Sequence, residues 1–118
     1  MHADWGEIRD LVLRTLEATA LEQAAVYIEP AVHDTGSTVA MGRDTAVADE
    51  PSILAFADLA PHMNWSHPCR YLIVGLTTHT VRSVQGQFPP AAERLRLIYR
   101  GKRVEDWMLL TLQPLIVA

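Results

Sequence analysis

The sequence predicts one α+β domain in which an N-terminal amphipathic helix packs on a mostly antiparallel sheet of four or five strands. Three observations predict this fold. Apolar residues recur at helical intervals near the N-terminus, several short apolar segments rich in β-formers follow, and the connections between those segments are short. The 118 residues, 49% of them apolar and 20% charged, fit a single globular domain over 1–118 and exclude collagen-like, disordered and coiled-coil classes.

The predicted helix runs from Asp4 to about Glu22. Asp4 is a favoured N-cap residue, and Glu7 follows it at the spacing of a capping box. Apolar residues then recur on one helical face at Ile8, Leu11, Val12, Leu16 and Ala20. Residues 24–28 either continue the helix or form a short strand, and Pro30 is expected to end whichever forms.

The middle of the chain predicts a loop and then two strands. The stretch from His33 to Pro51 mixes glycine, serine and acidic residues, so we expect a loop with at most one short strand around Val39 to Met41. Ser52 to Leu59 is apolar and predicts a strand or a short helical turn. Cys69 to Leu76 is the clearest buried strand, because it is short, almost continuously apolar and rich in β-formers.

Three more segments complete the predicted sheet. A turn at Thr77 to Thr80 precedes a strand from Val81 to Phe88, which two consecutive prolines end. From Arg94 to Lys102, basic and apolar residues alternate, which favours a strand with its basic residues on one face. A last apolar strand is predicted from Trp107 to Val117, where a proline restricts it to an edge or a bulge.

One segment resembles a known family. Residues 96–106, RLIYRGKRVED, with Pro89 and Pro90 upstream, are similar to the third-strand region of ubiquitin-like β-grasp domains. The resemblance covers less than a fifth of the chain. It implies a β-grasp-like sheet as an alternative arrangement, and it implies no functional residue.

Charge and motif content narrow the function classes. The net charge of −4 divides into −8 over residues 1–59 and +4 over residues 60–118, which indicates either an anionic partner or two halves that neutralise each other on folding. No phosphate-binding loop, dinucleotide fingerprint, zinc-protease motif or esterase elbow is present. Without an apolar run of about 20 residues or a signal-peptide pattern, we expect a soluble cytoplasmic protein with no membrane partner.

The segment 61–69 has the highest density of side chains that could act in catalysis or binding. Cys69 with His67 or His62 has the residue types of a nucleophile and its base, and Asn64 lies between the two histidines. These four are the candidate catalytic residues. The competing interpretation is structural, with a buried Cys69 behaving as a small hydrophobe and Trp65 filling the loop.

A zinc site is the alternative use of the same segment. His62, His67 and Cys69 offer three nitrogen or sulfur ligands, although their spacing matches no strong zinc signature. Cys69 is the only cysteine, so neither an internal disulfide nor a four-cysteine site can form within the chain. No metal is favoured, and no cofactor is expected.

Partner binding is predicted from exposed basic and aromatic residues. The candidates are Trp65, Arg94, Arg96, Arg100, Lys102 and Trp107. A basic strand over 94–103 fits an acidic protein surface, with nucleic acid as the less favoured ligand because the chain is acidic overall. The apolar residues around Trp107 and in the last strand favour a homodimer.

These observations rank three functions. The first is a small non-enzymatic interaction or accessory domain that binds a protein partner and self-associates, because no catalytic signature is present. The second is a small enzyme or metal-binding protein that uses the His62, His67 and Cys69 loop. The third is nucleic-acid binding through the basic strand at 94–103.

Overall fold

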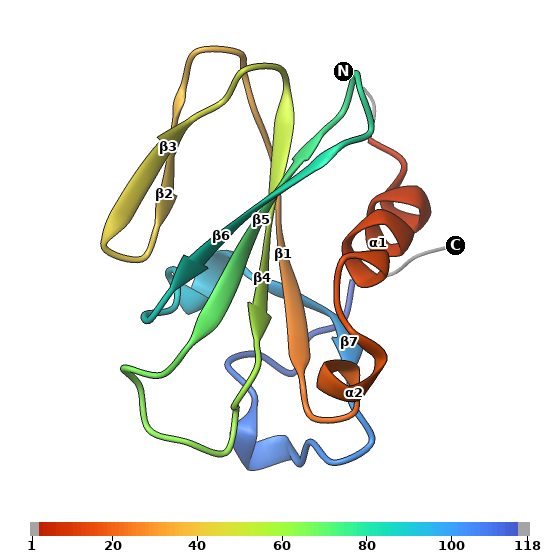
Figure 1. Ribbon diagram of the computed structural model, residues 1–118, viewed down its shortest axis with the longest axis vertical. Coiled ribbons are helices and arrows are strands. Elements are labelled where there is room, and N and C mark those ends of the chain that lie inside the picture. Colours follow the sequence, from red (N-terminus) through yellow and green to blue (C-terminus); the bar gives the residue numbers. More distant parts are fainter. Residues whose placement is uncertain (1–2, 116–118) are drawn as a thin grey trace.

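The computed structural model describes residues 3–115 and has the predicted α+β fold, with α1 (Trp5–Arg14) packed on a mostly antiparallel five-stranded sheet (Figure 1). A second short helix, α2 (Ala18–Leu21), leads into the first strand. The strands are β1 (Ala25–His33), β2 (Thr38–Met41), β3 (Asp44–Val47), β4 (Ser52–Asp58), β5 (Cys69–Gly75), β6 (Val81–Gly86) and β7 (Arg96–Arg100). Two 3-10 turns, η1 (Ala92–Arg94) and η2 (Asp106–Met108), complete the elements.

The sheet has the strand order β6-β5-β4-β1-β7, and each neighbouring pair is antiparallel. The hairpin β2–β3 forms its own two-stranded sheet. One apolar cluster joins α1 to one face of the large sheet. A second cluster joins the other face to the hairpin and to the C-terminal segment. The β-grasp-like segment forms the edge strand β7 and continues into η2.

The predicted N-terminal helix is wrong in its length. Asp4 does cap α1, because its carboxylate accepts a hydrogen bond from the Glu7 backbone N–H at 3.1 Å. The helix ends at Arg14, where the Thr15 hydroxyl donates to the Val12 carbonyl at 2.7 Å. Such bonding back to the preceding turn competes with helix propagation, so the rest of the predicted helix is split off as α2.

Residues 25–33 form β1, which does not end at the proline. Pro30 lies within the strand, and the pairing with β4 becomes irregular between Glu29 and His33. A proline removes one ladder donor, and a local irregularity accommodates that loss. The strand therefore extends to His33.

The predicted loop at 33–51 is a hairpin with two strands, of which β3 was not expected. Its turn contains Gly42, whose positive φ of 65° is favoured only for glycine. A Cβ atom at Gly42 would also lie 2.8 Å from the Phe88 carbonyl oxygen, so the turn packs directly on the chain after β6. The hairpin thereby covers the face of the sheet opposite α1.

The turn between β5 and β6 is held by Glu50. Its carboxylate accepts hydrogen bonds from the backbone N–H groups of Thr77 and Thr78, both at 2.9 Å, and from the Thr78 hydroxyl at 2.7 Å. These bonds, first of all those from Thr78, lower the pKa of Glu50 below its usual value. The β5–β6 hairpin is thus fixed at its turn.

The predicted strand 94–102 is shorter, and its alternation is interrupted. Arg94 belongs to η1, and Lys102 follows the end of β7. The pairing with β1 skips Ile98, because Val26 pairs with Tyr99 whereas Tyr27 pairs with Leu97. This bulge places Ile98 and Tyr99 against the same apolar cluster, so the basic residues do not form one continuous row.

The predicted last strand, Trp107 to Val117, is also wrong. Residues 106–108 form η2, and the chain then runs irregularly to a single parallel bridge between Pro114 and Leu97. Without its own N–H, a proline restricts strand pairing, which agrees with this isolated bridge. Residues 116 and 117 of the predicted strand lie outside the described residues. Within residues 3–115, none of the helices has the length and apolar character that crossing a bilayer requires.

Candidate functional site

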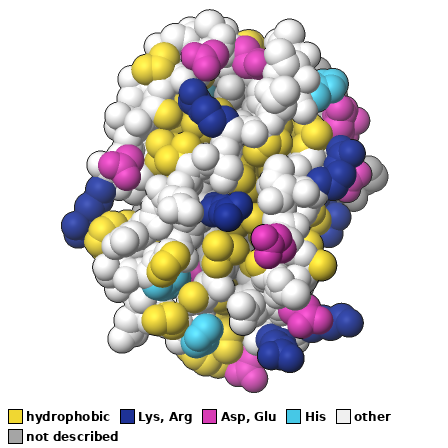
Figure 2. Space-filling view, in the orientation of Figure 1, with side chains coloured by type: hydrophobic (Ala, Val, Ile, Leu, Met, Phe, Trp, Pro, Cys, Tyr) yellow, Lys and Arg dark blue, Asp and Glu magenta, His cyan; other side chains and the backbone are white. Residues whose placement is uncertain are grey.

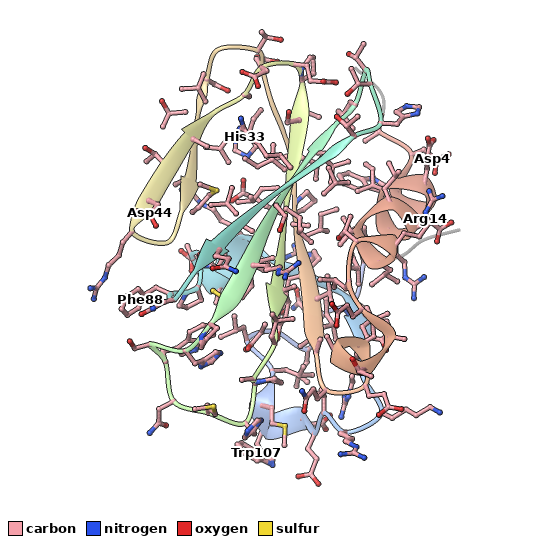
Figure 3. The ribbon with its side chains drawn as sticks, viewed as in Figure 1. Asp4, Arg14, His33, Asp44, Phe88 and Trp107 are labelled. Carbon is pink, nitrogen blue, oxygen red and sulfur yellow. The ribbon has the colours of Figure 1, made fainter. Side chains whose placement is uncertain are left out.

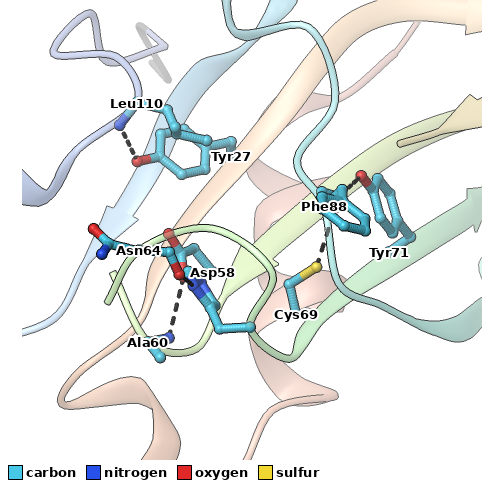
Figure 4. Close-up of polar contacts among 9 residues, drawn as sticks. Tyr27, Asp58, Ala60, Asn64, Cys69, Tyr71, Phe88 and Leu110 are labelled. Carbon is cyan, nitrogen blue, oxygen red and sulfur yellow. Dashed lines mark hydrogen bonds and ion pairs between the residues drawn. The ribbon is translucent and has the colours of Figure 1, made fainter. Parts of the chain in front are cut away.

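The loop between β4 and β5 contains a buried histidine–carboxylate pair. Asp58 ends β4, and its Oδ1 lies 2.7 Å from Nε2 of His67, with both side chains no more than 2% exposed (Figure 4). The same oxygen accepts the Ala60 backbone N–H at 3.1 Å. The other ring nitrogen of His67, Nδ1, donates to the Asn64 carbonyl at 2.8 Å. The loop is therefore folded around this pair.

Aromatic rings cover the buried pair. The Trp65 ring stacks on the His67 ring with centroids 4.2 Å apart and an interplanar angle of 21°. Trp65 in turn lies 5.9 Å from the fully buried Phe56, whose ring also contacts Tyr27 and Tyr71. Trp65 thus fills the loop, as its structural interpretation predicted.

The protons of the pair follow from its hydrogen bonds. A carbonyl oxygen only accepts, so Nδ1 of His67 carries a hydrogen. One further proton lies between Nε2 and the carboxyl group of Asp58, and both ring nitrogens are therefore engaged. Burial raises the pKa of Asp58, and the hydrogen bond from His67 opposes that shift.

This arrangement leaves little support for His67 as a catalytic base or a metal ligand. Neither of its nitrogens is free to take a proton from Cys69 or to coordinate an ion. His62 and Asn64 are exposed loop residues. In the part of the chain from 3 to 115, no three His, Cys, Asp or Glu side chains are grouped so as to hold a metal ion.

Cys69 is a buried free thiol at the start of β5 and is 1% exposed. Its Sγ lies 3.8 Å from the Phe88 carbonyl oxygen, which also accepts a hydrogen bond from the Tyr71 hydroxyl (Figure 4). Burial, followed by the nearby charge of Asp58, raises the pKa of Cys69 to about 11. At neutral pH the residue is a thiol, which is the weakly nucleophilic form.

Alkaline pH should destabilise the fold through such buried acids. Burial raises the pKa of Cys69 from 9.0 to about 11, and that of Tyr27 from 10.0 to about 12. The folded chain therefore holds protons that the unfolded chain releases, and stability falls as pH rises above the unfolded values. We expect a loss of about 3 kcal/mol by about pH 10.5, measured as the free energy of unfolding in denaturant.

Cys69→Ala provides the control for this pH dependence. Without the thiol, the decline should begin about one pH unit higher, where tyrosines of the unfolded chain ionise. An unfolding free energy that is constant between about pH 8 and about pH 10.5 would contradict the assignment.

The predicted partner-binding residues differ in their exposure and in their contacts within the chain. Trp107 is 67% exposed, and its indole N–H donates to Glu105 at 2.7 Å. Arg100 is committed within the chain, because it pairs with Asp106 at 2.6 Å and donates to the Val104 carbonyl. Trp65 is half-buried in its loop. The remaining predicted residues are the exposed Arg94 and Lys102 and the half-buried Arg96, which donates to the Leu95 carbonyl.

The charges of the two halves mix on the surface. Acidic and basic side chains are interspersed over the face that Figure 2 shows. Arg82, from the basic half, pairs with Asp49 from the acidic half at 3.4 Å, and His79 lies 3.1 Å from Glu7. The charge asymmetry along the sequence is therefore partly neutralised on folding.

A pocket of about 690 Å³ opens beside Cys69. It lies between the end of the β5–β6 hairpin and the turn of the β2–β3 hairpin, next to Phe88 (Figure 3). Arg43 and Arg70 contribute its basic side chains. Cys69 was a predicted site residue, but neither arginine was, because no spacing in the sequence links residues 43, 70 and 88.

Comparison of the chain with protein-family models, with curated proteins and with solved structures gave no match.

Proposed function

We propose that this chain is a non-enzymatic protein-interaction domain that self-associates by pairing the open edge of β6 with β6 of a second copy. The supporting observation is a difference between the two edges of the sheet. At the β7 edge, Leu97 donates to the Gln113 carbonyl at 3.1 Å and accepts from the Leu115 N–H at 3.0 Å. Among residues 3–115, β5 is the only strand that pairs with β6.

The hydrogen-bond pattern identifies the open backbone groups of β6. The Gly75 N–H donates to the Thr80 carbonyl at 2.9 Å, which makes these residues a hydrogen-bonded pair of the β5–β6 ladder. Hydrogen-bonded and non-hydrogen-bonded pairs alternate in an antiparallel ladder. Val81, Ser83 and Gln85 therefore direct their N–H and C=O groups away from β5. Such a row is a template for another strand.

If two copies pair about a two-fold axis through Ser83, the open N–H and C=O groups of each β6 form hydrogen bonds with the other β6. In that register Ser83 faces Ser83 of the second copy, and Val81 faces the other Gln85. Arg82 then lies opposite the other Val84, so no like charges face each other across the axis. The pairing would extend both sheets into one continuous sheet.

The composition of β6 supports pairing rather than protection. Natural edge strands are often blocked by proline, by several charges or by a covering loop. β6 has no proline, and its one charged residue, Arg82, is held by the Val47 carbonyl at 3.0 Å and by Asp49. The strand is therefore left with the features of a pairing edge.

Two lysine substitutions test this register. We expect the wild-type chain to sediment as a dimer, and Ser83→Lys to raise the dimer dissociation constant at least about tenfold, because two lysines would face each other across the axis. Gln85→Lys adds the same charge to the same strand but faces Val81, so this variant should remain dimeric. Analytical ultracentrifugation over a concentration series measures both.

Two outcomes would overturn the proposal. A wild-type chain that stays monomeric at about 100 μM would exclude pairing as a working state of the protein. Equal effects of the two lysine substitutions would show that Ser83 does not lie on the axis. Circular dichroism of each variant confirms that the fold is retained.

A further inference from the structure

The pocket beside Cys69 has the size and lining of a small-ligand site. Its volume of about 690 Å³ falls within the range of about 300–1,000 Å³ that is usual for such sites. Leu59, Pro68 and Phe88 supply apolar surface, and the Cys69 thiol lines the pocket between them. Gly86 lines the pocket with its backbone, and a Cβ atom there would lie 2.9 Å from the Tyr71 ring, so the strand packs directly on that ring.

The basic groups of the pocket are available to a ligand. Most arginines of the chain donate to a carbonyl or pair with a carboxylate. Within residues 3–115, Arg43 and Arg70 form neither a hydrogen bond nor an ion pair with another side chain or with the backbone. Asp44 is the one carboxylate in the lining, so the pocket carries a net positive charge in an acidic protein. An anion is the ligand that this charge favours.

Arg43 is also held in position. Its guanidinium carbon lies 3.7 Å from the centre of the Phe88 ring, a cation–π contact that leaves the edge of the guanidinium group free to donate. The Phe88 carbonyl is fixed by the Tyr71 hydroxyl and contacts the close-packed turn at Gly42. A donor that is fixed before binding loses less entropy when a ligand arrives.

We propose that this pocket binds a small organic anion, a carboxylate joined to an apolar body. The carboxylate is placed to accept hydrogen bonds from Arg43 and Arg70. The apolar body lies against Leu59 and Pro68 and covers the Cys69 thiol. This inference rests on the pocket and does not depend on the pairing of β6.

Simple carboxylates and their matched alcohols test the ligand class. We expect octanoate and 4-phenylbutyrate to bind saturably at one site, and to shift the backbone amide NMR signals of residues 85–88. Octanol and 4-phenylbutanol keep the apolar body but lack the charge, so they should bind at least about tenfold more weakly. Binding should also slow the reaction of Cys69 with a thiol reagent, which reports occupancy independently.

Three methionine substitutions locate the anion. Arg43→Met and Arg70→Met should each weaken carboxylate binding about tenfold, because each removes a charge-assisted donor. Arg94→Met is the matched control, since Arg94 is exposed on η1 and does not line this pocket. The proposal fails if neither carboxylate saturates below about 10 mM, if the alcohols bind equally well, or if Arg94→Met weakens binding as much.

Discussion

Replacing His67 with alanine is expected to lower the free energy of unfolding by about 3–5 kcal/mol, the usual cost of removing one partner from a buried charged pair. The variant leaves the carboxyl group of Asp58, which is 1% exposed, without its histidine. It also leaves the Asn64 carbonyl without its donor and removes the ring on which Trp65 stacks. Equilibrium unfolding in urea measures the difference.

His62→Ala is the matched control for this experiment. His62 lies in the same loop but is exposed, so its replacement should change the free energy of unfolding by less than about 0.5 kcal/mol. The cost of His67→Ala should also be smaller at acidic pH, because a protonated Asp58 carries no charge to bury. Equal costs for the two histidines would show that the buried pair does not anchor the loop.

The buried pair also explains why segment 61–69, which has the most functional side chains, is a weak candidate for a catalytic site. Both ring nitrogens of His67 form hydrogen bonds within the chain. The raised pKa of Cys69 keeps its sulfur protonated at neutral pH. Clustered functional groups are equally the means by which a chain folds a loop without regular structure. The accessible groups of this protein lie elsewhere, at the β6 edge and around the pocket arginines.

The sequence predicted the central strands of the large sheet better than the hairpin that packs on it. Apolar content and β-formers placed β4 and β5 almost to the residue, because burial on both faces leaves a continuous apolar signal. The hairpin strand β3 has the residues Asp-Thr-Ala-Val, which carry no such signal. It forms because β2 and the packed turn at Gly42 bring a partner to it.

Asp58 shows the limit of the site prediction. No role was predicted for Asp58 from the sequence, yet its side chain is buried at the end of β4. Its position directly after six residues of a buried strand was the available signal. The partner, His67, follows nine residues later, and only the folded loop brings the two together. The bulge at Ile98 was also not predictable from the sequence. A strict alternation of side chains predicted a row of basic residues along β7, but the irregular pairing with β1 interrupts that row.

Replacing Phe56 with alanine is the second large effect that we expect, at about 3–5 kcal/mol of unfolding free energy. Phe56 is fully buried, and its ring lies 6.1 Å from that of Tyr27, 5.9 Å from that of Trp65 and 5.1 Å from that of Tyr71. Truncation leaves a cavity that these large rings cannot collapse to fill. Trp65 also loses the ring that supports it over His67.

The chain offers its only other phenylalanine as the control. Phe88 is half-buried after β6, so Phe88→Ala should cost about 1 kcal/mol, in proportion to the smaller apolar area that it buries. Hydrogen exchange separates a local from a general effect. In Phe56→Ala the amides of residues 59–68 should exchange faster by a larger factor than those of α1, because the lost ring supports the loop through Trp65. Equal costs for the two phenylalanines would mean that the loop is supported by its hydrogen bonds alone, and that the aromatic stack contributes nothing to holding Asp58 and His67 together.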